Sequence, residues 1–178
     1  GGAMSRLHWT GGTLELTGGS TDTGLNVSVG GTLAGIGTVG GDVGGAGTIS
    51  PGNSPGLLSI TGDLTQDAVG ELLIELAGTT RGSEYDALDL TGDFNAGGTL
   101  HVVLLDDFAP QLNDRFNLLD FAAFTGDFAT LDLPSLNGGL AWDTTALGTD
   151  GTLSVVAAPE PGSVALLALG GLMLLLRR

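Results

Sequence analysis

The sequence contains no cysteine and no lysine, and it is poor in charged and aromatic residues. Its 178 residues include 20 acidic side chains and five basic ones, all arginine, so the formal net charge is −15. The absence of cysteine excludes disulfide bonds, thiol nucleophiles and cysteine-bound metal sites. The shortage of basic residues argues against nucleic-acid binding, which needs basic patches that neutralise phosphates. It argues equally against a lyase of acidic polysaccharides, which needs a basic cleft.

The charge is distributed unevenly along the chain. Residues 1–161 contain all 20 acidic residues and three arginines, which gives −17, whereas residues 162–178 contain two arginines and no acid. Hydrophobic residues make up 42% of the chain, so we expect a folded acidic body joined to a short apolar tail. Residues 1–5 show neither the charged nor the apolar part of a signal peptide, and we expect the natural chain to extend upstream.

Glycine and short apolar segments dominate residues 1–56. The chain has 33 glycines, and a glycine inside a helix costs about 1 kcal/mol relative to alanine. The triplet Gly-Thr-Leu begins at residues 12, 31, 98 and 151, and between residues 31 and 49 pairs of a polar and an apolar residue recur at steps of about five or six residues. Such steps suit the short faces of a β-solenoid, in which each coil stacks on the preceding one. The sequence therefore predicts an all-β fold that starts with Gly-rich β-solenoid repeats over residues 1–56.

Residues 57–157 contain longer strand candidates and form the predicted second β-rich domain. Apolar residues alternate in Glu71–Leu76, which gives one apolar and one mixed face. The pattern Thr-Gly-Asp between apolar residues spans 60–64, 90–94 and 124–128, and we expect each copy to form a turn between strands. Longer β coils or a β-sandwich-like cap are predicted here. The expected strands are Leu57–Thr61, Glu71–Leu76, Ala87–Thr91, Thr99–Leu105, Phe116–Asp120, Ala129–Leu133, Leu140–Thr144 and Thr152–Ala157.

A dinucleotide-binding pattern lacks the context that its chemistry needs. Gly35–Gly40 matches G-x-G-x-x-G, but the following Gly41–Gly45 cannot form the helix whose N-terminus binds a pyrophosphate. We therefore expect solenoid corners here, and no cofactor.

A hydrolase pattern fails in the same way. Gly52–Gly56 matches G-x-S-x-G, and Ser54, Asp86 and His101 follow in the order of a triad. The residue after the serine is Pro55, which has no N–H to offer an oxyanion hole. We expect a turn at this position, no catalytic residue, and a protein that is not an enzyme.

Metal and acid–base sites are weakly indicated. The two histidines lie 93 residues apart. Aspartate-rich turns can supply calcium ligands, although solvated carboxylates are the simpler interpretation. A carboxylate pair on one strand face is about 13 Å apart, too far for either glycosidase mechanism. The residues considered are His8 and His101, the calcium candidates Asp86, Asp89, Asp106 and Asp107, and the pair Glu71 and Glu75. None is expected to form a metal site.

Residues 11–157 resemble the repeat-rich passenger regions of autotransporter-like surface proteins. The resemblance rests on Ser50–Gly56 (SPGNSPG), on Glu84–Leu88 (EYDAL) and on the Gly-Thr-Leu repeats. No pattern of a translocator barrel follows in the sequence, so we do not expect an autotransporter in the strict sense.

The C-terminal tail carries the most specific signal. Val164–Leu176 is a 13-residue run without a polar side chain, preceded by Pro159-Glu160-Pro161 and Gly162-Ser163 and closed by Arg177-Arg178. A helix of this length spans about 20 Å, short of the ~30 Å hydrocarbon core, which by length alone would favour a buried core helix. The terminal arginines fit retention on the cytoplasmic side, so we expect a membrane-directed hydrophobic helix over 164–178, with residues 158–163 as a linker.

Pro159-Glu160-Pro161, the apolar run and the terminal Arg177-Arg178 pair together resemble the PEP-CTERM sorting signal. The resemblance implies a Gram-negative source that makes exopolysaccharide, and a membrane processing enzyme, an exosortase, that acts at the tripeptide. It further implies export, transient anchoring in the inner membrane, removal of the tail, and delivery to the cell surface or the extracellular matrix.

Two functions agree with the sequence. The first is a non-catalytic surface or matrix protein, adhesive or associated with exopolysaccharide, which the repeats and the lack of a catalytic site favour. The alternative is the stalk and sorting tail of an exported enzyme whose catalytic domain lies upstream. More Gly-Thr-Leu repeats upstream would favour the first, and a compact segment rich in His, Asp or Ser would favour the second.

Overall fold

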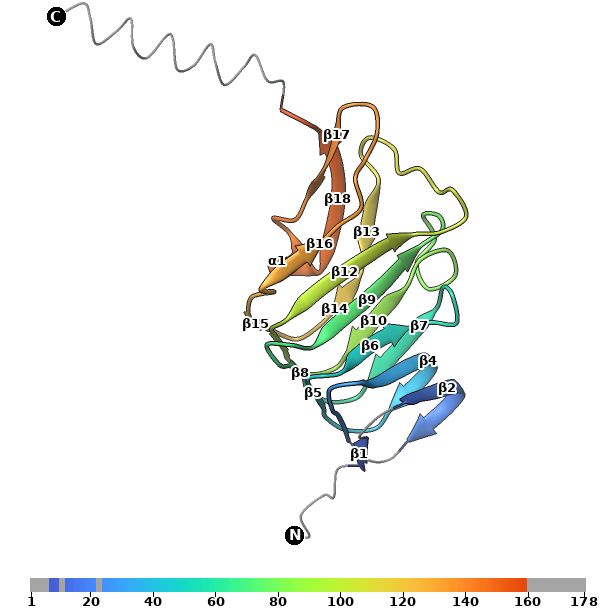
Figure 1. The fold of residues 1–178 in the computed structure, drawn as a ribbon, viewed down its shortest axis with the longest axis vertical. Helices are drawn as coiled ribbons and strands as arrows, with labels where there is room; N and C mark the ends of the chain where they lie inside the picture. The colour runs from blue at the N-terminus through green and yellow to red at the C-terminus, as the bar shows by residue number, and fades with distance from the viewer. Residues whose placement is uncertain (1–6, 10–11, 22–23, 160–178) are drawn as a thin grey trace, which may run out of the picture.

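The computed structural model describes residues 7–9, 12–21 and 24–159, and these form an all-β fold with largely parallel sheets (Figure 1). The predicted helix over residues 164–178 lies outside the described residues. In the described part, the one α-helix is the single turn α1 (Leu147–Asp150). No helix in this part is long and apolar enough to span a membrane.

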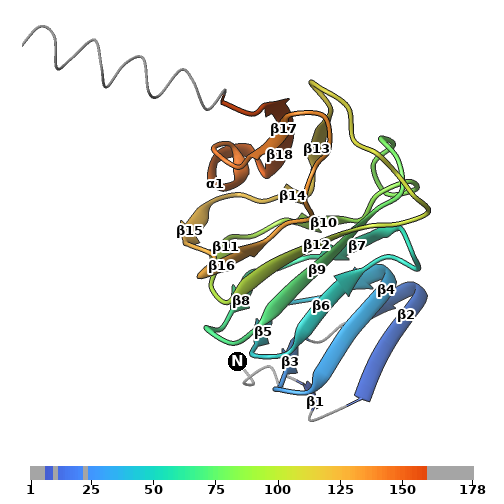
Figure 2. The same ribbon diagram turned by 45° about the horizontal axis from the view of Figure 1, so that its top comes forward.

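Two parallel sheets run along the molecule (Figure 2). From β5 to β15, each coil of the chain adds one strand to the first sheet and two to the second. The first sheet has six strands in the order β1-β3-β5-β8-β11-β15. They are β1 (Leu7–Trp9), β3 (Leu25–Val27), β5 (Val43–Gly45), β8 (Leu64–Gln66), β11 (Phe94–Ala96) and β15 (Phe124–Gly126). Every neighbouring pair is parallel.

The second sheet has nine strands and bends around its longest inner strand, β4 (Gly31–Val39). The first half of β4 pairs with one neighbour, β6, and the second half with another, β7, so the sheet divides into two arms. The order is β14-β10-β7-β4-β6-β9-β12-β16, with β2 (Gly12–Thr21) also on β4. The other strands are β6 (Thr48–Pro51), β7 (Leu57–Ile60), β9 (Glu71–Leu76), β10 (Ala87–Leu90), β12 (Thr99–Leu104), β14 (Leu119–Asp120) and β16 (Thr130–Asp132).

The hydrophobic core consists of ladders of apolar residues stacked in register between the sheets. One ladder joins equivalent positions of the first sheet, and another joins those of the second. The first is Leu25, Val43, Leu64, Phe94 and Phe124, and the second is Leu33, Ile49, Leu72 and Leu100. Most of these side chains are fully buried, and each leucine contributes about 2 kcal/mol by leaving water. Because these ladders run from coil to coil, the few apolar residues of each coil together form one continuous core.

A third, antiparallel sheet closes the C-terminal end of the stack. It has the order β13-β18-β17, with β13 (Arg115–Asn117), β18 (Thr152–Ala157) and β17 (Leu140–Asp143). Phe116 and Leu153 are paired across it, and both are fully buried. The copy of Gly-Thr-Leu at residue 151 leads into β18, which pairs antiparallel with both of its neighbours. The copies at residues 12 and 31 instead stack directly on each other in parallel register.

The Thr-Gly-Asp repeat forms turns in two of its three copies. The turns at residues 61–63 and 91–93 lead into β8 and β11, and their aspartates stack. Asp42 Oδ1 accepts a hydrogen bond from the backbone N–H of Asp63 (3.1 Å), and Asp63 Oδ1 accepts one from that of Asp93 (2.9 Å). The third copy was wrongly expected to be a turn. Phe124–Gly126 is strand β15, because Phe124 stacks on Phe94 in the first ladder.

Candidate functional site

The serine, aspartate and histidine of the hydrolase pattern do not form a triad. Ser54 lies on the loop between β6 and β7, and its hydroxyl donates a hydrogen bond to Glu75 Oε2 (2.7 Å). His101 lies on the outer face of β12. Its Nδ1 is 3.8 Å from Glu71 Oε1, and its Nε2 is 3.7 Å from Asp132 Oδ2. The serine and the histidine thus contact different carboxylates.

Asp86 has a structural position instead. Its side chain is fully buried, and its two oxygens accept hydrogen bonds from the backbone N–H groups of Gly56 (2.7 Å) and Glu75 (2.9 Å). Burial, the largest influence, raises the pKa of Asp86 to about 7, although the two N–H donors oppose it. Gly52 packs against the same carboxylate with φ +89°, and a Cβ on it would collide with Asp86 Oδ1. Asp86 therefore fastens the Ser50–Gly56 loop to β9.

The remaining acidic candidates lie on different elements: Asp89 is on β10, and Asp106 and Asp107 follow β12. Asp89 accepts a hydrogen bond from the guanidinium of Arg81 (2.6 Å), and Asp120 lies 3.3 Å from that group. Asp106 and Asp107 have φ values of 51° and 57° and occupy the turn after β12. Among the described residues, no three His, Asp or Glu side chains are grouped so that they could hold a metal ion. Gly35–Val39 is the second half of strand β4, and Gly40 follows it with no helix after it.

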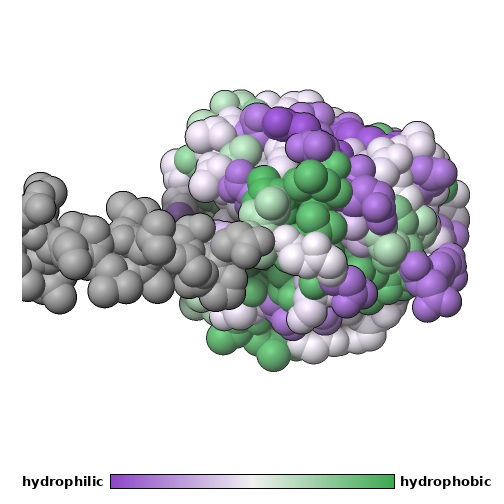
Figure 3. All heavy atoms as spheres, turned by 90° about the horizontal axis from the view of Figure 1, so that it is seen from above, coloured by the Kyte–Doolittle hydropathy of each residue, from purple (hydrophilic) through white to green (hydrophobic). Residues whose placement is uncertain are grey.

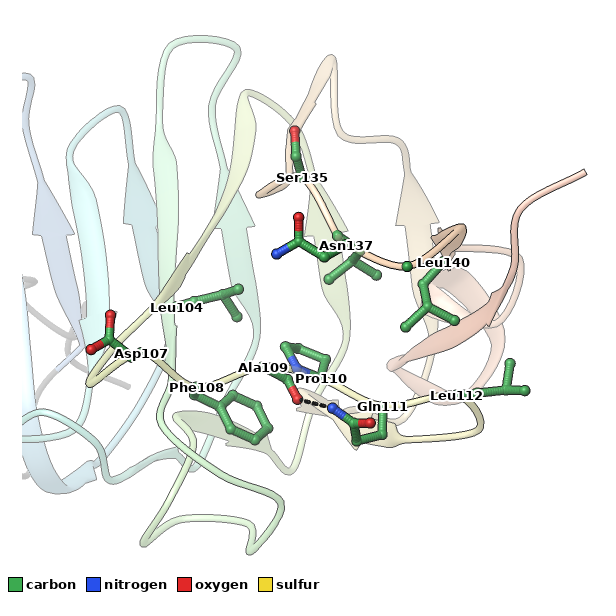
Figure 4. A pocket seen from close by; sticks show the side chains of 12 residues that line it. Leu104, Asp107, Phe108, Ala109, Pro110, Gln111, Leu112, Ser135, Asn137 and Leu140 are labelled. Carbon is green, nitrogen blue, oxygen red and sulfur yellow. Dashed lines mark hydrogen bonds between the residues drawn. The ribbon is translucent and has the colours of Figure 1, made fainter.

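A cavity of about 650 Å³ opens at the C-terminal end of the molecule, between two loops that are distant in sequence (Figure 4). One wall is the segment after β12, and the other is the segment before β17. Most of its lining residues are apolar, and the others are three neutral polar residues and one carboxylate, that of Asp107. The lining residues are Leu104, Asp107, Phe108, Ala109, Pro110, Gln111, Leu112, Ser135, Leu136, Asn137, Gly138 and Leu140.

The first wall is held by backbone hydrogen bonds at both of its ends. The N–H of Phe108 donates to Leu105 O (2.8 Å), which closes the Asp106-Asp107 turn, and the N–H of Asn113 donates to Val155 O of β18 (2.9 Å). The ring of Phe108 packs edge-on against Phe116, with ring centroids 6.1 Å apart. The aromatic side of the cavity is therefore fixed to the core.

The second wall is fastened by an indole and by the end of β18. The Nε1–H of Trp142 donates to Pro134 O (2.8 Å), and the N–H of Ala158 donates to Gly139 O (2.7 Å). Trp142 also stacks edge-on against Phe116, with ring centroids 6.0 Å apart. Both walls thus contact the same buried ring, which gives the cavity a rigid base.

The polar groups of the cavity are largely available to a ligand. Ser135 and Asn137 side chains make no hydrogen bond within the described part of the chain. Gln111 Nε2 donates to Ala109 O (2.7 Å), as Figure 4 shows, while its side-chain oxygen accepts no hydrogen bond from residues that the structure describes. Sequence reasoning missed this cavity, because its walls lie in irregular segments with no periodic pattern. The one signal there, Asp106-Asp107, indicates a calcium candidate and not a cavity.

The tripeptide Pro159-Glu160-Pro161 follows directly after this end of the described fold. β18 ends at Ala157, Ala158 is bonded to Gly139, and Pro159 is the last described residue. Glu160, Pro161 and the arginines Arg177 and Arg178 lie outside the described residues. In the space-filling view of this end, apolar side chains lie among hydrophilic ones (Figure 3).

The fold thus defines the chain as an all-β protein with parallel sheets and an antiparallel cap. No model of a known protein family matches it, and a comparison with curated proteins gives no match.

Proposed function

We propose that this chain is a non-catalytic protein of the cell surface or extracellular matrix, exported and then sorted by a PEP-CTERM-type tail. We further propose that its parallel sheets form a β-solenoid, whose coils become longer toward a β cap. The proposed partners are the inner membrane, transiently, an exosortase-type processing enzyme, and exopolysaccharide. The proposed function requires neither a cofactor nor a nucleic acid.

The observation that supports this proposal is the packed strand that immediately precedes the tripeptide. β18 ends at Ala157, its side chains Leu153 and Val155 are buried in the core, and the N–H of Ala158 donates to Gly139 O. The tripeptide of residues 159–161 follows immediately. Cleavage at this tripeptide would leave β18 and its buried side chains in the mature protein.

The length of chain between Ala158 and the apolar run limits how far the folded residues can lie from the membrane while the tail is anchored. Five residues lie between Ala158 and Val164, the start of the apolar run. Fully extended, this segment carries the chain about 20 Å from Ala158 to Val164. The end of the body that carries β17 and β18 would therefore face the membrane, and the processing enzyme would act close to this end.

The experiment is expression of the full-length protein with a suitable signal peptide in a host that has the sorting enzyme. Mature protein should lack the apolar tail, as measured by intact mass. The double variant Pro159→Ala with Glu160→Ala should stay uncleaved and membrane-bound, because the recognised tripeptide is gone. Ser163→Ala, a change outside the tripeptide, is the matched control and should be processed normally. An identical mature C-terminus in wild type and double variant would contradict the proposal.

A further inference from the structure

The lining of the cavity between residues 104–112 and 135–140 has a distinct chemistry. Its single charged side chain is that of Asp107, and none of the lining residues is basic. The nearest base in sequence, Arg115, lies 4.0 Å from Asp150. The acidic charge of residues 1–161, −17, adds to the negative field around the opening. A phosphate, sulfate or uronate group would therefore enter against the field and find no positive partner.

The neutral part of the lining combines an apolar surface with free hydrogen-bonding groups. Phe108 presents a ring that its contact with Phe116 holds in place, and Leu104 and Leu140 extend the apolar surface. The amide of Asn137 and the hydroxyl of Ser135 lie on the facing wall, as Figure 4 shows. A ligand that fits has one apolar face and several hydroxyl groups, and the volume of about 650 Å³ is typical of small-molecule sites.

We propose that this cavity binds an uncharged hexose unit of a glycan. The axial C–H groups of such a ring form a flat apolar patch that packs against an aromatic side chain. Its hydroxyls both donate and accept, which suits the amides of Asn137 and Gln111 and the hydroxyl of Ser135. The inference names the class of exopolysaccharide that the protein would bind, and it rests on the exopolysaccharide association in the proposed function. It selects neutral polymers over acidic ones.

The test is calorimetric titration of the full-length chain, held in lipid nanodiscs, with three probes of similar length. These are cellotetraose and maltotetraose, which are neutral, and tetragalacturonic acid, which is anionic. We expect saturable binding of at least one neutral probe and at least tenfold weaker binding of the anionic one. Hydrogen exchange measured by mass spectrometry should show added protection in residues 105–114 and 134–140.

Two single-residue variants test whether the neutral probe binds in this cavity. Asn137→Ala should weaken binding of the neutral probe about three- to tenfold, the effect of losing one hydrogen-bonding side chain. Asn95→Ala, at an exposed asparagine on β11, is the matched control and should bind as wild type does. Since Asn137 is exposed and unbonded, its variant should fold normally, and the exchange map of the wild type locates the site independently.

Three results would overturn the inference. They are equal or tighter binding of the anionic tetramer, absence of binding by both neutral probes, and protection confined to segments outside the cavity. None of these affects cleavage of the tail, which is read from the mature C-terminus, so failure here is distinguishable from failure of the sorting proposal.

Discussion

Asp86 should make the protein less stable as pH rises from 4 to 8. In the folded state burial raises the pKa of this carboxyl from 3.8 to about 7. Between these values the folded protein holds a proton that the unfolded chain has lost, so the free energy of unfolding falls with increasing pH. The full shift corresponds to about 4 kcal/mol at about 1.4 kcal/mol per pH unit.

The perturbation is Asp86→Asn, which keeps the size of the side chain and removes its titration. The variant places an amide NH₂ against one of the N–H groups of Gly56 and Glu75, and leaving that donor unpaired costs about 1–3 kcal/mol. Wild type should therefore be the more stable of the two at pH 4. Its advantage should shrink by up to about 4 kcal/mol by pH 8, as its buried carboxylate becomes charged.

Urea unfolding of both proteins, followed by tryptophan fluorescence at one-unit steps from pH 4 to pH 8, measures this difference. Asp67→Asn, a change at an exposed aspartate before β9, is the matched control and should leave the profile of wild type unaltered. A difference between wild type and Asp86→Asn that stays flat or grows with pH would refute the reasoning. It would mean that the two N–H donors outweigh burial and keep the carboxylate charged throughout.

Two further predictions concern the backbone and the tail. Gly98 and Gly138 both have left-handed φ, +54° and +71°, but a Cβ on Gly98 would collide with the carbonyl oxygen of Gly70, while one on Gly138 meets open space. Gly138→Ala should cost about 1–2 kcal/mol and Gly98→Ala about 1–3 kcal/mol more, measured by urea unfolding; equal losses would contradict the collision. Deletion of residues 162–178 should leave a soluble body whose far-UV circular dichroism shows far less helix than the globular average of about a third. Aggregation of the truncated protein would show that the tail belongs to the core.

Local patterning predicted several strands accurately. The alternation of Glu71–Leu76 predicted β9 with its observed ends, and Thr152–Ala157 likewise matches β18. In both segments alternate side chains face the core, and this is the property that a period of two reports. The strands β8, β11 and β15 were missed, because three residues are too few to show a period.

The sequence patterns did not predict which distant segments pair with each other. Phe116–Asp120 was expected as one strand, yet it forms β13 and β14, since Phe116 pairs antiparallel with Leu153 and Leu119 pairs parallel with Leu88. A pattern along the chain cannot distinguish these partners, because both bury the same kind of side chain.

Composition and periodicity were enough to predict the all-β class and the acidic body, because both are properties of neighbouring residues. The remaining features depend on tertiary contacts. Stacking of one passage of the chain on the next placed Asp86 against Gly56, 30 residues away, and separated Ser54 from His101. It also brought residues 104–112 beside 135–140 to form the cavity. Such contacts depend on which strands stack and on where the chain returns, and neither leaves a signal in neighbouring residues.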